Sequence, residues 1–466
     1  MKKFFSKFVG DKQFYKLVLA VSIPIMIQNG ITNVVTLVDN VMVGQLSTEA
    51  MSGVSIVNQF IFIFNLLVFG AISAAGIFTA QYYGKGDVDG VRYTFRLKIL
   101  MNIIATIIAI ICFYLFKNEL IGLFLLANET SGDLTATLNF GIDYLLIMLI
   151  GLAPYSIAQA YASTMRETGD SVTPMVSSIV AVLTNCLLNA ILIFGLFGLP
   201  AMGVKGAAIA TVISRFVELL ILVFKTHFNT EKYPFIVKAY ASFKVPKTLL
   251  KQIIIKGLPL MLNEFLWALA MILRNQCYST RGLDVVAAQN ISATLFNVFN
   301  VIYMALGNAA AIIIGAELGA GEIEKAKTDA DKLMAFSVII TIGIAVLYAG
   351  TSLFFPYVYN TSEEVRVLAR NMMLLSSINM PFVAYANSAY FTMRSGGKVA
   401  ITFIFDSGFM WVIVMPLCFI LSYLTSLPII PLYFICQATE IVKAFFGASL
   451  YRKKTWAKSL VNNELQ

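Results

Sequence analysis

The chain has 466 residues, of which 59% are hydrophobic and only 13% are charged, and its mean hydropathy is +0.80. Soluble globular chains are about half apolar and about a quarter charged, so this composition excludes a water-soluble protein and indicates one that lies in lipid. The net charge of +9 would suit a nucleic-acid-binding protein, but the distribution of the charge argues against that class.

Long apolar stretches follow one another down the whole chain, separated by short polar breaks. A membrane-spanning helix needs about 20 mostly apolar residues, and twelve stretches reach that length. They predict an all-α polytopic membrane protein. The breaks near Pro200 and Pro428 are short and apolar, so these two boundaries are the hardest to place. The predicted spans are 14–43, 51–80, 93–116, 134–162, 170–195, 203–224, 253–279, 286–316, 333–355, 366–392, 399–423 and 428–449.

The basic residues are distributed unevenly between the two sides that alternate loops would occupy. One side, which includes both chain ends, holds 27 of the 34 lysine and arginine residues, and the other side holds five. Loops rich in lysine and arginine face the cytoplasm in membrane proteins. We therefore expect a multi-pass protein of the cell (plasma) membrane with both termini in the cytoplasm, and no interaction with nucleic acid.

The sequence also repeats itself over a long period. Residues 22–29 match residues 257–264 at an offset of 235, and Gly84-Lys85-Gly86-Asp87 matches Gly319-Ala320-Gly321-Glu322 at the same offset. Each half then holds six spans that run in the same direction, a plan used by transporters whose substrate sites lie between the repeats. We expect two six-helix bundles related by pseudo-twofold symmetry: an amino-terminal lobe (1–225, helices 1–6), a cytoplasmic linker (226–250) and a carboxyl-terminal lobe (251–466, helices 7–12).

Distinctive motifs stand at the ends of several spans. They are Val38-Asp39-Asn40-Val41-Met42-Val43-Gly44-Gln45-Leu46, Ala80-Gln81-Tyr82-Tyr83-Gly84-Lys85-Gly86-Asp87, Asn185 with Asn189 and Ile193-Phe194-Gly195, Gly319-Ala320-Gly321-Glu322, and Arg394-Ser395-Gly396-Gly397. Taken together and in this order, they resemble the motifs of the multidrug and toxic compound extrusion (MATE) transporters. The resemblance covers the whole chain and all twelve spans.

This resemblance implies an antiporter that exports organic, often cationic and amphipathic, drugs or metabolites while protons or sodium ions move inward. It implies two helical bundles that alternate between outward-open and inward-open states. We expect a small-molecule substrate and the lipid bilayer as the partners, a monomer, and no cofactor besides the coupling ion, H⁺ or Na⁺. The wider superfamily includes flippases for lipid-linked precursors, which keeps a lipid-linked or amphipathic metabolite open as the substrate.

The first span carries a row of polar residues spaced by three and four, which places them on one face of a helix. The row is Asn29, Thr32, Asn33, Thr36, Asp39 and Asn40. Charged groups inside a membrane are costly and are usually functional. Asp39 lies at the outer end of the row, where a partly desolvated carboxylate could take up an external proton or bind sodium together with amide and hydroxyl oxygens. The alternative is a helix cap at the membrane interface. In MATE transporters the matching aspartate couples to the cation.

Two asparagines on the fifth span, Asn185 and Asn189, lie one helical turn apart and could hydrogen-bond to Asp39 or bind a cation. In one branch of the family an aspartate stands at the position of Asn189, so a relay of two aspartates is doubtful here. Tyr144 of the fourth span matches a family tyrosine and could join them, whereas its neighbour Asp143 favours an interfacial, solvated role. Among these polar residues, Asn29, Thr36 and Tyr144 are expected to contact the substrate.

Glu264, on the seventh span, is the second candidate for cation coupling. In the sodium-coupled branch of the family a glutamate of this helix binds the cation; the alternative is a structural pair with Arg274. Asp406, on the eleventh span, could complete a site with Glu264 or make structural hydrogen bonds. If the coupling ion is sodium, Asp39 and Glu264 are the expected metal ligands.

Further polar residues follow one face of the eighth span, and Asn290 and Asn297 are expected to line the substrate cavity. Two other intramembrane carboxylates favour local ion pairs, because a basic residue lies three positions away: Glu218 with Arg215, and Glu440 with Lys443.

Other functional classes find little support. No GxxxxGK[ST] phosphate loop occurs, and the single histidine, His227, has no evident triad partner, so we do not expect an enzyme. A flippase would predict a strongly basic cavity, but once the basic residues near the span ends are assigned to the loops, only Arg215 and Arg274 count as intramembrane. A channel or a receptor is disfavoured by the two-lobe repeat and by the lack of a sizeable extramembrane domain.

Overall fold

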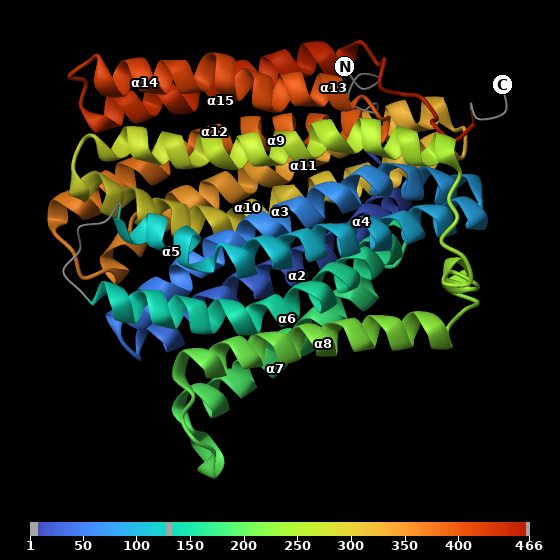
Figure 1. The fold of residues 1–466 in the computed structure, drawn as a ribbon. Coiled ribbons are helices and arrows are strands. Elements are labelled where there is room, and N and C mark those ends of the chain that lie inside the picture. Colours follow the sequence, from blue (N-terminus) through green and yellow to red (C-terminus); the bar gives the residue numbers. More distant parts are fainter. Residues whose placement is uncertain (1–7, 127–132, 463–466) are drawn as a thin grey trace. The chain divides into compact units, whose positions relative to one another are not determined.

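The structure, a computed structural model, describes residues 8–126 and 133–462 (Figure 1). In this described part, twelve helices are long and apolar enough to cross a membrane, which confirms the predicted all-α polytopic fold. They are α2 (Lys12–Gly44), α3 (Thr48–Lys85), α4 (Val88–Leu115), α6 (Leu134–Glu167), α7 (Val172–Phe194), α8 (Gly203–Phe228), α9 (Lys247–Ser279), α10 (Leu283–Gly319), α11 (Ile323–Thr351), α12 (Glu363–Ser395), the stretch Val399–Tyr423, and α15 (Ile429–Arg452).

The two boundaries that were hardest to place are both present. α7 ends at Phe194 and α8 begins at Gly203, while the eleventh span ends at Tyr423 and α15 begins at Ile429. One helix was not predicted: α5 (Lys117–Leu126) lies between the third and fourth spans. It is ten residues long, too short to cross a bilayer.

The eleventh span is irregular in its middle. It begins as α13 (Val399–Phe403), continues through two π-helical stretches (Ile404–Gly408 and Met410–Val414), and ends as α14 (Met415–Tyr423). A π-helical turn widens the helix locally and is frequently found at functional sites. Asp406 lies in the first of these stretches.

The chain forms two compact units. One comprises residues 1–26, 80–86 and 258–466, and the other comprises residues 27–79 and 87–257. Three helices, α2, α3 and α9 (Lys247–Ser279), therefore contribute residues to both units. The division into lobes at residues 225 and 251 stays a prediction.

In the unit of residues 27–79 and 87–257, α8 packs against both α6 and α7, and α4 packs against α6 (Figure 1). Its apolar core is drawn from several helices, including Val57, Phe64, Leu145 and Leu152, all buried. The α7–α8 pair is held close by Gly206, because a Cβ atom at this position would lie 2.6 Å from the carbonyl oxygen of Leu192.

The predicted linker is ordered against the same unit. Arg96 of α4 is buried and donates to the carbonyl groups of Ala239 and Lys238, both at 2.7 Å. Asp170, in the α6–α7 loop, accepts hydrogen bonds from Lys232 Nζ at 2.6 Å and Tyr233 Oη at 2.5 Å. These contacts fix the segment after α8 to the amino-terminal helices, so residues 232–239 are part of a folded surface.

In the other unit, α12 is the central helix and packs against α10, α11 and α15 (Figure 1). Near its end α3 crosses the end of α10 at very short range. A Cβ atom on Gly84 would overlap the carbonyl of Ala316, and a Cβ atom on Gly319 would overlap the carbonyl of Gln81. Gly84 and Gly319 are the residues that the sequence repeat pairs, so the crossing is reciprocal.

Candidate functional site

Asp39 lies on α2, five residues before the helix ends, and is half-buried. Asn189 of α7 is fully buried and donates from Nδ2 to Asp39 Oδ1 at 2.6 Å. The same Nδ2 atom lies 3.2 Å from Asn185 Oδ1, one turn earlier, and Asn185 Nδ2 lies 3.2 Å from Thr211 Oγ1 of α8. These four residues, Asp39, Asn185, Asn189 and Thr211, are called the Asp39 cluster below.

The amide of Asn185 forms a better network when its oxygen and nitrogen are exchanged. Its nitrogen then donates to both carboxylate oxygens of Asp39, at 2.9 and 3.1 Å, and its oxygen accepts from the backbone and the hydroxyl of Thr211 at 3.3 and 3.2 Å. In this orientation, two asparagines donate to one carboxylate. Hydrogen bonds to a charged group are about twice as strong as those between neutral groups, so they hold Asp39 against α7.

The cluster also offers an unused acceptor. Asn189 Oδ1 is buried and has no hydrogen-bond partner among the described residues. A buried oxygen without a donor is costly, and here it lies on the residue that contacts the carboxylate. A proton needs only the carboxylate, whereas a sodium ion prefers several oxygen ligands, which Asp39, Asn189 and Thr211 carry. In the described part of the chain, this cluster included, no three His, Cys, Asp or Glu side chains gather as they would around a metal ion.

The expected substrate residues are dispersed. Tyr144 is buried and donates to Asn58 Oδ1 at 3.4 Å. Asn29 is half-buried on α2, and the side chain of Thr36 lies outside the described residues. Asn290 and Asn297 are both exposed on α10. The structure thus joins Asn185 and Asn189 to Asp39, and it gives Tyr144 a partner outside that cluster.

A second polar cluster lies among α9, α12, the eleventh span and α15. Lys443 Nζ lies 2.6 Å from Asp406 Oδ1, and Asn263 Nδ2 donates to Asp406 Oδ2 at 2.9 Å. Asn263 is itself fixed, because its Oδ1 accepts from the hydroxyl of Ser407 at 2.8 Å and from the backbone N–H of Ser407 at 3.3 Å. Asp406 therefore has a donor on each carboxylate oxygen.

Glu264 is connected to this second cluster through a tyrosine. Tyr390 of α12 lies 3.5 Å from Glu264 Oε1, and Asn263 Nδ2 lies 3.3 Å from the same tyrosine hydroxyl. A chain of polar contacts thus runs from Lys443 through Asp406, Asn263 and Tyr390 to Glu264. These five residues are called the Asp406 cluster below.

The two basic side chains make their close contacts with residues other than those that the sequence spacing favoured. Lys443 lies 2.6 Å from Asp406, and its charge also interacts with Glu440. Arg215 donates to the carbonyl of Gly151 at 3.2 Å and lies over the ring of Tyr155, and its charge also interacts with Glu218. Both basic side chains are long enough to reach a neighbouring helix, and the spacing of three along one helix does not capture that reach.

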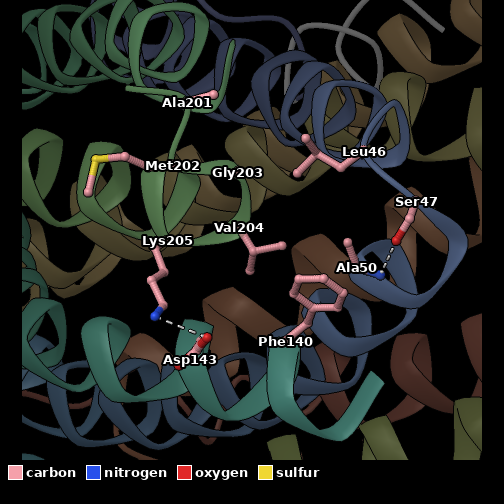
Figure 2. A pocket seen from close by; sticks show the side chains of 10 residues that line it. All are labelled: Leu46, Ser47, Ala50, Phe140, Asp143, Ala201, Met202, Gly203, Val204 and Lys205. Carbon is pink, nitrogen blue, oxygen red and sulfur yellow. Dashed lines mark hydrogen bonds and ion pairs between the residues drawn. The ribbon is translucent and has the colours of Figure 1, made fainter. Parts of the chain in front are cut away.

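A cavity of about 320 Å³ is lined by the α2–α3 turn, the first turns of α3, α6 and α8, and the α7–α8 loop (Figure 2). Lys205 Nζ and Asp143 Oδ2 lie 3.2 Å apart at its wall, and both side chains are about half exposed. Leu46, Phe140 and Val204 supply apolar surface. None of its lining residues belongs to the Asp39 cluster. Asp143 thus has the solvated position that the sequence favoured.

Comparison with solved structures supports the class that this fold defines, that of polytopic α-helical membrane proteins. A multidrug resistance MATE family transporter of the MOP superfamily, solved in an outward-facing conformation, superposes with a TM-score of 0.83 at 18% identity, covering 96% of this chain and 97% of the other. A MATE protein in the bent conformation gives 0.85 at 19% identity, with 97% and 99% covered. At these identities, the likeness establishes the fold.

The family follows from the sequence. The MatE family model matches residues 24–191 and 259–420, and so the chain belongs to the MatE family of multidrug efflux transporters. The two matched segments begin at positions that the internal repeat pairs, which confirms the repeat. The probable multidrug resistance protein YoeA of Bacillus subtilis is 24% identical over 467 aligned positions, covering 95% of this chain and 94% of that relative.

Proposed function

We propose that this transporter exports organic, cationic and amphipathic drugs or metabolites in exchange for protons or sodium ions. The observation that carries the proposal is the Asp39 cluster. It places a carboxylate within a spanning helix, against two buried amides at hydrogen-bond distance. An ionisable group in such a position is functional by default, because the membrane interior penalises its charge.

In the proposed mechanism, cation binding at Asp39 favours the state that releases the drug outward, and drug binding favours release of the cation inward. Linkage requires each ligand to change the affinity of the other by the same factor. Asn185 and Asn189 position Asp39 and, for sodium, Asn189 and Thr211 supply oxygen ligands beside the carboxylate. Asn29, Thr36, Tyr144, Asn290 and Asn297 stay candidates for substrate contact.

The proposal includes the cellular setting. The transporter acts as a monomer in the plasma membrane. Both termini lie in the cytoplasm, an orientation that the uneven distribution of basic residues supports. Its partners are the small-molecule substrate and the lipid bilayer. A lipid-linked or amphipathic metabolite as the flipped substrate is the alternative, and the experiment below includes it as an outcome.

The test is transport of ethidium into or out of proteoliposomes under an imposed proton gradient or an imposed sodium gradient, applied separately. We expect one gradient to accelerate wild-type transport, and Asp39→Asn to abolish that acceleration. Asp143→Asn is the matched control, since Asp143 lies at an exposed wall of the same unit, and it should retain the response. Glu264→Gln reports on the second candidate.

Wild-type transport that is indifferent to both gradients would contradict the antiport proposal. Full gradient response in Asp39→Asn would remove Asp39 from coupling. Failure to move ethidium, combined with movement of a fluorescent lipid between leaflets, would support the flippase alternative.

A further inference from the structure

The Asp406 cluster contains a positively charged side chain, the ammonium group of Lys443. Lys443, on the last helix, reaches α13–α14 and lies 2.6 Å from Asp406, and only 10% and 17% of the two side chains are exposed. Bringing two charges out of water costs more than a surface pair does, and the pair persists only when both partners are well satisfied. Asp406 is satisfied here by Lys443 on one oxygen and by Asn263 on the other.

We propose that the Lys443 ammonium is a tethered counter-cation: it occupies the place at Asp406 that a mobile coupling ion would take, and so excludes sodium from this half of the protein. Ammonium and sodium carry the same charge, and both bind carboxylate oxygens. A sodium ion at Asp406 would have to displace Lys443 and leave it buried without its partner. Lys443 thereby sets which carboxylates take part in ion coupling.

The surroundings of Asp406 support this assignment. Asn263 does not offer its amide oxygen as a further ligand to a cation at Asp406. That oxygen, Oδ1, already accepts two hydrogen bonds from Ser407. Asp406 itself lies in a π-helical stretch, a feature that is frequent at functional sites. The ring of Phe405 lies 5.6 Å from Lys443 Nζ and adds a cation–π contact.

Removing the ammonium should convert the cluster into a cation site. In Lys443→Met, Asp406 keeps its carboxylate and its bond to Asn263. Asn263 in turn contacts Tyr390, and Tyr390 contacts a second carboxylate, Glu264. Without the lysine charge, the two carboxylates attract a small cation more strongly, and sodium favours oxygen ligands. Arg394, which lies over the ring of Tyr390, is present in both proteins, so the comparison isolates the effect of Lys443. This inference extends the proposed function, but it concerns ion binding and can be tested without transport.

The experiment measures the melting temperature of the purified full-length protein, at constant pH, in sodium chloride and in choline chloride of equal ionic strength. We expect Lys443→Met to be less stable than wild type in choline and to gain a sodium-specific rise in Tm of about 3 °C or more over any wild-type rise. The double variant Lys443→Met/Asp406→Asn should lose that rise, because it lacks the Asp406 carboxylate that would bind the cation.

Asp406→Asn alone keeps the inference testable if Lys443→Met does not fold. With Lys443 in place, this change should leave the sodium response of the wild type unaltered. Two results would overturn the inference: a Lys443→Met protein that folds but responds equally to sodium and choline, or a wild-type sodium response that Asp406→Asn removes. Neither result depends on whether the protein exchanges drugs for ions, so failure here and failure of the antiport proposal are distinguishable.

Discussion

At the scale of single residues, Asp39 depends on the two amides beside it. Asn189 donates to it at 2.6 Å and is fully buried. Replacing Asn189 with leucine removes that donor and the unused oxygen of the same amide. A hydrogen bond to a charged group is worth about 1.5–3 kcal/mol, so we predict that the apparent cation affinity in coupled transport changes by about tenfold or more.

Half-saturating proton or sodium concentration in the ethidium assay measures this effect. Thr184→Val is the control, since Thr184 lies on the same helix, is partly exposed, and donates to the carbonyl of Val180. An Asn189→Leu protein with wild-type cation dependence would show that the contact with Asp39 has no part in coupling.

Asp170 gives a prediction about stability outside the membrane. Burial alone would raise its pKa, but hydrogen bonds from Lys232, Tyr233 and Thr173 outweigh burial and lower the pKa from 3.8 to about 2. A carboxylate with a depressed pKa stabilises the folded state above its unfolded-state pKa, and this contribution disappears as the pH falls through the folded-state value. The shift corresponds to about 2 kcal/mol.

Thermal unfolding of wild type and Asp170→Asn across pH checks this. The variant should be less stable at neutral pH, and the difference should shrink between about pH 4 and pH 2. Asp143→Asn serves as the comparison, because its exposed pair with Lys205 contributes little. A destabilisation by Asp170→Asn that persists unchanged at the lowest pH would show that the charge of Asp170 is not the cause.

The sequence predicted some of these contacts and could not predict others. Asn185 and Asn189 are one turn apart on one helix, so their common direction follows from helix geometry, and the resemblance to MATE transporters supplied Asp39 as their partner. The Lys443–Asp406 pair joins residues from different helices. It depends on tertiary packing, and the spacing rule pointed to Glu440 because it considers one helix alone.

At the scale of helices, the crossing of α3 and α10 permits no side chain. A Cβ atom on Gly319 would overlap the carbonyl oxygen of Gln81, which is backbone and cannot swing away. We predict that Gly319→Ala lowers stability by at least about 1–3 kcal/mol, the usual cost of overpacking. Gly84→Ala should do the same from the other side of the crossing.

Melting temperature in detergent is the measurement, and Gly343→Ala is the matched control. Gly343 also lies in a spanning helix, α11, but has open space around it, and alanine favours a helix more than glycine does. It should be neutral or slightly stabilising. Equal melting temperatures for Gly319→Ala and Gly343→Ala would contradict the close crossing.

Hydropathy was sufficient to predict the spanning helices because lipid imposes a minimum length on each of them. It could not predict α5, which is too short to span, or the π-helical stretches around Asp406. A π-helical turn changes the hydrogen-bonding pattern of a helix without changing its apolar composition, so the sequence pattern of the eleventh span is that of an ordinary helix. The close approach of Gly84 to Gly319 was likewise hidden, although the repeat had already paired the two residues.

At the scale of the whole molecule, the proposed function describes an exchanger built from two related halves whose polar clusters have diverged. The amino-terminal cluster holds a carboxylate between amides, and the carboxyl-terminal cluster holds one neutralised by Lys443. In this description, ion coupling depends on Asp39, and the drug and the ion must be able to drive each other.

The most direct test of that claim reverses the driving force. Proteoliposomes are loaded with a pH-sensitive or a sodium-sensitive dye, and an ethidium gradient is imposed with no initial gradient of either ion. We predict that downhill movement of ethidium drives one ion in the opposite direction in the wild type and in Asp143→Asn, and that Asp39→Asn shows no such ion movement. Ethidium transport by the wild type without any opposing proton or sodium movement would contradict the account.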